Sequence, residues 1–170
     1  MIDAVLGWVS DNRDWAFLIA FLFAPAETTL IVSAFIPSTA IPFGIGGLVA
    51  AGYLDFVPLF LGAALGAVAG SLLSWAAGRL YGPSLLRLGP MRRRRDRMRR
   101  ARLAFKRWGA PAVTIGHLGG PLRAVAFTLS GLTAMPLWTF LPFTALGAFA
   151  WAWATIMAGK LGGDLLGALF

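Results

Sequence analysis

Three ionisable side chains lie inside apolar stretches of this 170-residue sequence: Glu27, His117 and Arg123. A charge at the centre of a bilayer costs at least about 2.5–3.5 kcal/mol, so such residues normally face a bundle interior and pair. We therefore expect Glu27 to meet Arg123, which would place a proton carrier beside an anion-binding group. The alternatives are an ion pair that only locks the fold, and side chains that reach up to the headgroups.

His117 allows two interpretations that the sequence does not separate. Its imidazole titrates near neutral pH and suits proton transfer or gating. A lone histidine beside a break in a helix is as often a hydrogen-bonded filler. Glu27 would carry a proton if its partner moved away in one of two conformations.

The amino-acid composition indicates whether these ionisable groups lie in a soluble protein or in a membrane protein. Hydrophobic residues make up 58% of the chain and charged residues 13%, whereas a soluble domain carries about 25% charged residues. A chain of this length cannot hide so much apolar surface from water. The sequence therefore indicates a membrane protein and excludes soluble enzymes and disordered chains. With no cysteine and one histidine, it also excludes disulfides and thiol catalysis, and we expect no metal and no cofactor.

The first half of the chain is expected to span residues 15–80, after an interfacial segment at 1–14. It would contain a broken hairpin at about 24–54 and a transmembrane helix at 56–78. The break is marked by Pro37, Ser38, Thr39 and Pro42, of which the two hydroxyl residues are expected to cap helix ends. A stripe of small residues predicts close packing of the 56–78 helix: Gly62, Gly66, Gly70 and Gly78.

A basic loop follows at 79–108. It holds most of the basic residues of the chain, which predicts a cytoplasmic location. Docking of anionic headgroups is a second reading that can coexist with the first. Nucleic acid is not an expected partner, because no aromatic residues interleave with the arginines to stack bases.

The second half, 109–163, repeats the pattern. It would contain a broken hairpin at 109–131, a transmembrane helix at 134–159 and a C-terminal tail at 164–170. The break is marked by Gly119, Gly120 and Pro121. The predicted fold is an all-α integral membrane protein with two inverted-topology repeats, each a broken re-entrant helical hairpin followed by a transmembrane helix. Secondary transporters are often built this way.

Four ordered stretches of the sequence resemble the DedA family of bacterial membrane proteins, whose shared core is the VTT or SNARE-associated domain. They are Glu27 with Pro37 and the following GIGGLVAAG, GAVAGSLLSWAAGRLYG at 66–82, the segment at 116–140, and GAFAWAWATIMAGKLGG at 147–163. The second stretch places Arg79 in register with the family's G-R-x-x-G element. The chain departs from the family pattern at Thr39, His117 and Gly120, which fall where relatives have an acid, an arginine and a proline.

The resemblance implies two re-entrant hairpins that meet at mid-membrane. It further implies transport of lipid-linked phosphates, notably undecaprenyl phosphate, across the bacterial inner membrane, coupled to the proton gradient. On that basis Arg123 and Arg79 would bind the substrate phosphate, whereas Glu27 and His117 would carry or gate the proton. The expected partners are membrane lipids, anionic lipid headgroups, protons and a second protomer in a homo-oligomer.

Two other classes of function are alternatives to a lipid translocase. A non-transporting scaffold for envelope homeostasis would use the buried pair only to fix the hairpins. An enzyme acting on lipid phosphates is not expected, because the sequence offers no nucleophile–base arrangement, no carboxylate cluster for Mg²⁺ and no second histidine.

Overall fold

The structure is a computed structural model that describes residues 15–28, 46–85, 103, 107–119 and 123–169. All regular structure in these ranges is helical, as the sequence predicts. The helices are α2 (Trp15–Thr28), α4 (Phe56–Leu85), α7 (Pro111–Leu118), α8 (Arg123–Leu132) and α9 (Leu137–Leu169), with a further helical segment at 46–50. The predicted 1–14 segment, the Pro37–Pro42 break and most of the basic loop lie outside the described residues.

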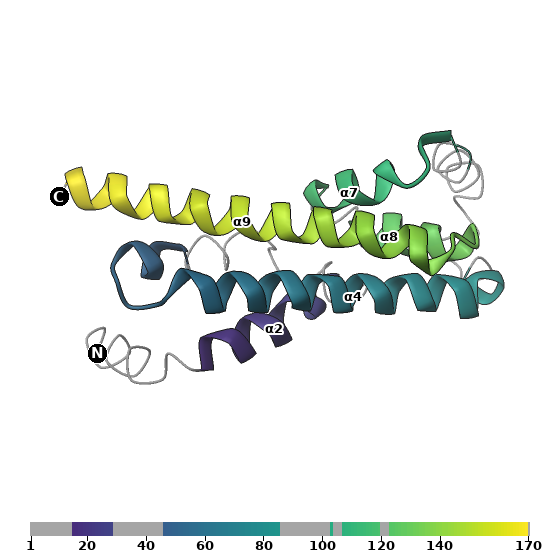
Figure 1. Ribbon diagram of the computed structural model, residues 1–170, viewed down its shortest axis with the longest axis horizontal. Helices are drawn as coiled ribbons and strands as arrows, with labels where there is room; N and C mark the ends of the chain where they lie inside the picture. Colours follow the sequence, from purple (N-terminus) through teal and green to yellow (C-terminus); the bar gives the residue numbers. More distant parts are fainter. Residues whose placement is uncertain (1–14, 29–45, 86–102, 104–106, 120–122, 170) are drawn as a thin grey trace.

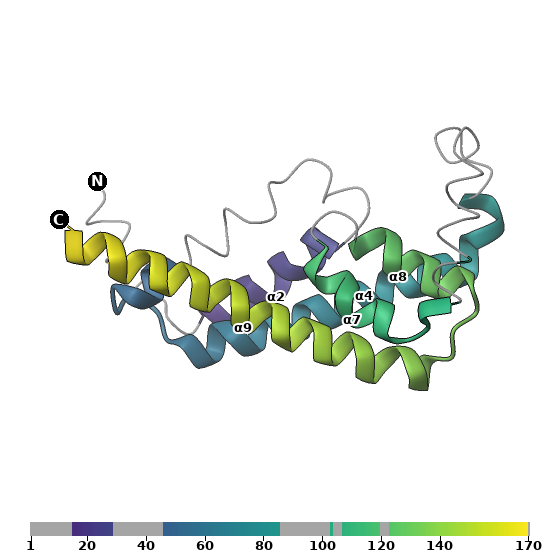
Figure 2. The same cartoon turned by 90° about the horizontal axis from the view of Figure 1, so that it is seen from above.

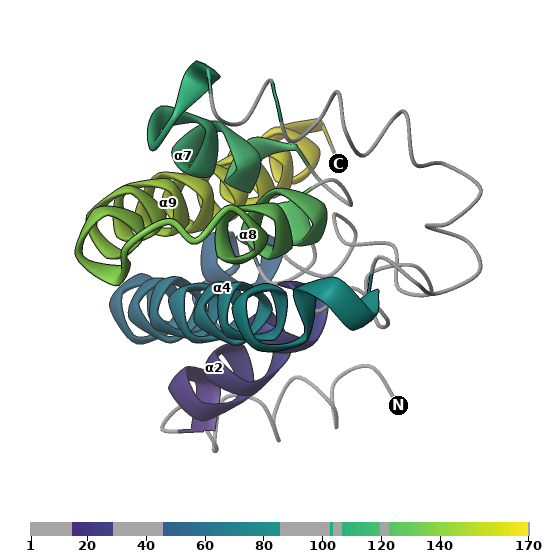
Figure 3. The same cartoon turned by 90° about the vertical axis from the view of Figure 1, so that its right-hand side faces the viewer.

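Two long helices, α4 and α9, form the centre of the molecule and run antiparallel side by side (Figure 1). Both are long and apolar enough to cross a membrane, over Phe56–Gly82 and Leu137–Gly162. They correspond to the helices expected at 56–78 and 134–159. The end-on view shows α2 against one side of α4, with α7 on the outer side of α9 (Figure 3).

The helix ends differ from the sequence-based boundaries. Helix α4 continues to Leu85, into the segment assigned to the basic loop, although this extension includes Gly82 and Pro83. Helix α9 continues to Leu169, where the sequence predicts a tail. The glycine pair at 162–163 does not end the helix, since each glycine costs only about 1 kcal/mol in a helix interior.

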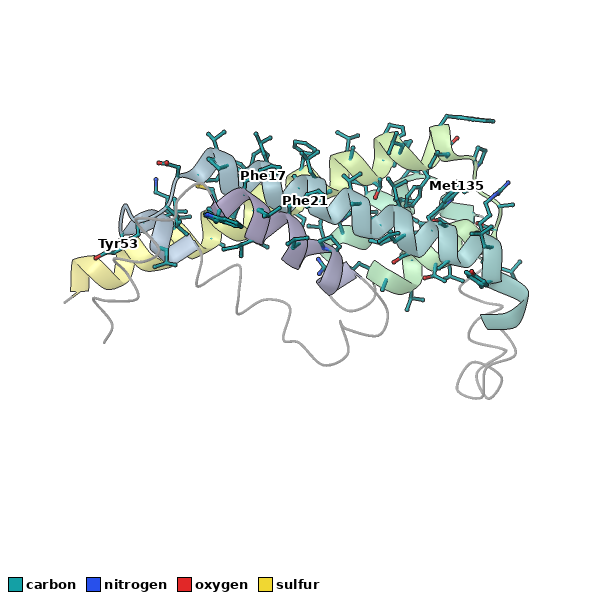
Figure 4. All side chains as sticks on the ribbon, turned by 90° about the horizontal axis from the view of Figure 1, so that it is seen from below. Phe17, Phe21, Tyr53 and Met135 are labelled. Atoms are coloured by element: carbon teal, nitrogen blue, oxygen red, sulfur yellow. The ribbon has the colours of Figure 1, made fainter. Side chains whose placement is uncertain are left out.

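Helix α2 approaches α4 at two glycines of the predicted stripe. A Cβ at Gly62 would meet the Phe17 carbonyl oxygen, and a Cβ at Gly66 would meet that of Phe21. The rings of Phe17 and Phe21 stack with centroids 6.1 Å apart, one turn apart along α2 where it lies along α4 (Figure 4). Glycine therefore allows a backbone-to-backbone approach that no other residue would permit.

Helices α7 and α8 form an antiparallel pair separated by a break after Gly119 (Figure 2). Helix α7 packs on α9, where Thr114 Oγ1 donates a hydrogen bond of 2.8 Å to the Phe143 carbonyl oxygen. Helix α8 packs instead on α4, where a Cβ at Gly78 would meet the Thr128 carbonyl and a Cβ at Gly131 would meet the Trp75 carbonyl. The two arms of the pair thus contact different long helices.

The turn from α8 to α9 fixes the start of α9. The Met135 amide donates to the Ser130 carbonyl at 3.0 Å and the Ala134 amide to the Gly131 carbonyl at 2.9 Å, which is the Schellman pattern. Ala134 occupies the left-handed position, at φ 59°, where glycine is usual. The turn presents the Met135 carbonyl to Trp75 Nε1, which donates to it at 3.2 Å.

The helical segment at 46–50 closely approaches the backbone of α9. A Cβ at Gly46 would lie 2.6 Å from the Ile156 carbonyl oxygen and 2.7 Å from Gly159 Cα. Its end is a second Schellman turn, with Gly52 at φ 77° and the Tyr53 amide donating to the Leu48 carbonyl at 3.0 Å. This segment joins α4 through that turn at the end of the molecule opposite Met135 (Figure 4).

Candidate functional site

Two ionisable side chains are buried on either side of the break between α7 and α8. His117 is in the last turn of α7 and is 0% exposed, and Arg123 is the first residue of α8 and is 1% exposed. Arg123 is the largest fully buried side chain of the described part of the chain. The break therefore brings both groups, six positions apart in sequence, into the protein interior.

One face of α9 receives both side chains. Thr144, Gly147, Ala148 and Trp151 recur at helical spacing, so they lie on the same side of α9. We call these four residues the α9 cradle. Thr144 and Ala148 are 0% exposed, which shows that this face is turned inward.

Thr144 and Gly147 of the α9 cradle hold the imidazole of His117. His117 Nε2 and Thr144 Oγ1 share a hydrogen bond of 2.9 Å. Gly147 leaves room for the ring, because a Cβ there would lie 2.5 Å from His117 Cδ2 and 2.9 Å from the Thr114 carbonyl oxygen. Glycine at 147 is therefore required for the histidine to lie against α9. Within the described residues, His117 Nδ1 has no hydrogen-bond partner.

Trp151 of the α9 cradle holds the guanidinium of Arg123. Arg123 Cζ lies over the Trp151 ring, 4.8 Å from the centroid. This distance is within the range of a cation–π interaction, which is stronger where water is excluded. The Trp151 ring therefore restrains the guanidinium against this face of α9.

The end of α2 reaches the same region. Ala24 packs with Ala67 of α4 and Ala148 of α9, and Trp151 packs against this cluster. The backbone of Glu27 lies one turn further along α2. The Glu27 side chain is outside the described residues, so its pairing with Arg123 stays a prediction. The packing does bring the α2 end to the part of α9 that holds Arg123.

The other predicted phosphate ligand, Arg79, lies elsewhere. It is exposed, and its guanidinium is 5.7 Å from the centroid of the Trp75 ring. A chain of ring contacts leads inward from there: Trp75 stacks on Phe140 at 5.9 Å, Phe140 meets Phe127 at 6.2 Å, and Phe127 meets His117 at 4.6 Å. The structure thus separates an exposed arginine from a buried one.

The remaining predicted positions are placed as follows. Gly70 is buried in α4, as are Gly62, Gly66 and Gly78. Gly119 ends α7, and its amide donates to the Gly116 carbonyl at 3.1 Å. Gly120 and Pro121 lie outside the described residues. No group of three metal-ligating side chains occurs in the described ranges.

Thr144, Gly147 and Trp151 were not predicted as site residues, although Gly147 and Trp151 lie in the 147–163 stretch that resembles the DedA family. They occur within a long apolar helix, where a tryptophan or a threonine is unremarkable. The available signal was their spacing at positions 144, 147, 148 and 151, which marks one face of the helix. Small residues on another face of α9, such as Ala150 and Ala154, are exposed.

The hydrogen bond to His117 gives a first prediction. Replacement Thr144→Val removes the hydroxyl and leaves a buried imidazole nitrogen unsatisfied, which we expect to destabilise the protein by about 1–3 kcal/mol. Thr144→Ser keeps the hydroxyl and should lose much less. Thermal unfolding of the detergent-solubilised variants measures both. Equal melting temperatures for the valine and serine variants would contradict the assigned bond.

Comparison with known proteins identifies the family. The family model of the VTT domain matches residues 36–161, which include both long helices, the α7–α8 pair and the α9 cradle. The chain belongs to the VTT-domain family. The fold features of this VTT protein, with α4 and α9 as candidate spans, agree with a membrane location.

Named relatives support the same assignment. The chain is 32% identical over 123 residues to the inner membrane protein YohD of Escherichia coli, covering 72% of this chain and 63% of that protein. It is 20% identical to the E. coli inner membrane protein YabI, covering 92% of this chain and 61% of that protein. It is 24% identical to the E. coli protein DedA, covering 92% and 73%.

The chain therefore spans less than two thirds of the length of YohD and YabI. No solved structure matches it at a significant level. The resemblance to the DedA family, inferred from four sequence stretches, is confirmed. This VTT protein is a membrane protein, and its relatives YohD and YabI are named as inner membrane proteins of E. coli.

Proposed function

We propose that this VTT protein is a lipid translocase that moves a phosphate-bearing lipid across the bacterial inner membrane. Undecaprenyl phosphate is the first substrate to test, as the family resemblance implies. The observation that carries the proposal is the fully buried Arg123, held by the α9 cradle in a protein with two candidate membrane-spanning helices. Arginine suits a phosphate because its fork of donors matches two phosphate oxygens.

The proposed architecture is an inverted repeat of two hairpins, each followed by a long helix. The supporting contacts come in corresponding pairs. In the first arm of each hairpin, α2 meets α4 at Gly66 and α7 meets α9 at Gly147. In the second arm, the 46–50 segment meets α9 at Gly159 and α8 meets α4 at Gly78. The separation from Gly66 to Gly78 equals that from Gly147 to Gly159.

The same correspondence extends to the turns. The second arm of each hairpin, the 46–50 segment in one and α8 in the other, ends in a Schellman turn. The left-handed residue is Gly52 in the first turn and Ala134 in the second. The long helices then begin four residues after Gly52 and three after Ala134, and run in opposite directions (Figure 1). An antiparallel pair of equivalent helices is what inverted repeats require, and transporters with this architecture bind substrate where the repeats meet. In this proposal Arg123 binds the phosphate where the two repeats meet.

Proton coupling belongs to the same proposal. Glu27, at the end of α2, and His117, in the α9 cradle, are the groups that would exchange a proton as the repeats move. The α4 end and the α7 start lie at the same end of the molecule (Figure 1). The basic loop between them would face the cytoplasm by the positive-inside rule, where its arginines would gather anionic lipid.

The test is translocation by purified protein in proteoliposomes. Fluorescent undecaprenyl phosphate and phosphatidylglycerol are placed in the inner leaflet, and their arrival outside is followed with and without a pH gradient. We expect faster movement than in protein-free vesicles, with a preference for the monophosphate and a dependence on the gradient. If vesicles that contain well-folded protein translocate lipid no faster than protein-free vesicles, the proposal is overturned and a scaffold function is favoured.

A further inference from the structure

We propose that Trp151 is a positioning residue for the phosphate-binding arginine: its ring face holds the Arg123 guanidinium in place for a phosphate monoester headgroup. The inference rests on the proposed function for its biological meaning, but it concerns binding and is tested by binding. Neither the family match nor the named relatives assign a role to this tryptophan.

The Trp151 ring forms one side of the site that holds the Arg123 guanidinium. Arg123 Cζ lies over the Trp151 ring at 4.8 Å, and the arginine is 1% exposed. Trp151 itself packs against the cluster of Ala24, Ala67 and Ala148, which joins α2, α4 and α9. Small residues on three helices thus fix the ring, and the ring in turn limits where the guanidinium can go.

The chemistry of the contact explains how a ring can position a cation. An aromatic face attracts the cation through its quadrupole and leaves the net charge in place. A guanidinium that the ring already restrains has less conformational entropy to lose when a phosphate binds.

Trp153 provides a matched control on the same helix. It is two positions from Trp151 and 55% exposed, on a different face of α9. The replacement Trp153→Leu makes the same chemical change as Trp151→Leu, but at a position that we expect to face the membrane. It removes no contact with Arg123 in the described structure.

The experiment measures binding of dihexanoyl phosphatidic acid, a water-soluble phosphate monoester lipid, to the detergent-solubilised full chain by titration calorimetry. The series is wild type, Trp151→Phe, Trp151→Leu, Trp151→Met and Trp153→Leu. We expect the dissociation constant to rise about tenfold or more for Trp151→Leu and Trp151→Met, since a desolvated cation–π contact is lost. Trp151→Phe should lie between these and wild type, and Trp153→Leu should match wild type.

The graded series distinguishes positioning from packing. A purely structural tryptophan would be replaced equally well by leucine, methionine or phenylalanine, so equal binding across the three Trp151 variants overturns the inference. So does a wild type that fails to bind the phosphate lipid. A wild type that binds with the expected order, but moves no lipid in proteoliposomes, leaves the inference standing and overturns the proposed function instead.

Discussion

Replacement Arg123→Ala is expected to reduce lipid translocation by about a hundredfold or more. The fork of Arg123 can give a phosphate two charge-assisted hydrogen bonds, each worth about 1.5–3 kcal/mol. Its removal also leaves the α9 cradle with no full positive charge near Trp151. Translocation in proteoliposomes, with lipid monophosphate as substrate, measures the loss.

Two further variants make this result specific. Arg107→Ala removes an exposed arginine just before α7 and should leave the rate within about twofold, because exposed charges contribute little. Arg123→Lys keeps the charge but lacks the planar fork, so we expect an intermediate rate. The melting temperature of each variant is measured in parallel. A folded Arg123→Ala protein with wild-type translocation would show that the buried arginine is structural.

The position of Arg123 was partly predictable from the sequence. Its charge inside an apolar stretch indicates burial and a functional role, and the structure buries it. Its contacts were not predictable, because they depend on which helix passes beside it. Trp151 is distant in sequence and lies on a helix that the composition marks only as apolar. Tertiary packing decides such a contact, and hydropathy does not report it.

The same distinction applies to the helices. The long apolar runs predict α4 and α9 directly, because length and composition suffice for a spanning helix. The glycine spacing at 62, 66, 70 and 78 predicts close approach but not the partner. The structure divides this stripe between α2, at Gly62 and Gly66, and α8, at Gly78. One helix therefore serves both halves of the chain, which a search along a single segment cannot reveal.

Gly131 is where the second-largest effect is expected. Replacement Gly131→Ala would place a Cβ against the Trp75 carbonyl oxygen and 2.8 Å from the Arg79 amide nitrogen. Both atoms belong to the α4 backbone, so neither can move aside as a side-chain end would. Overpacking of this kind costs about 1–3 kcal/mol. We expect the melting temperature to fall by several degrees.

The control is Gly162→Ala in α9, where a Cβ would have nothing within 4 Å. That change should leave the melting temperature unchanged or raise it, since alanine stabilises a helix interior by about 1 kcal/mol relative to glycine. Equal melting temperatures for the two variants would contradict the close packing of α8 on α4. The Gly131 variant should also translocate slowly, because α8 begins at Arg123. A helix displaced from α4 at residue 131 carries the guanidinium away from Trp151, so the contact that sets stability also sets the geometry of the site.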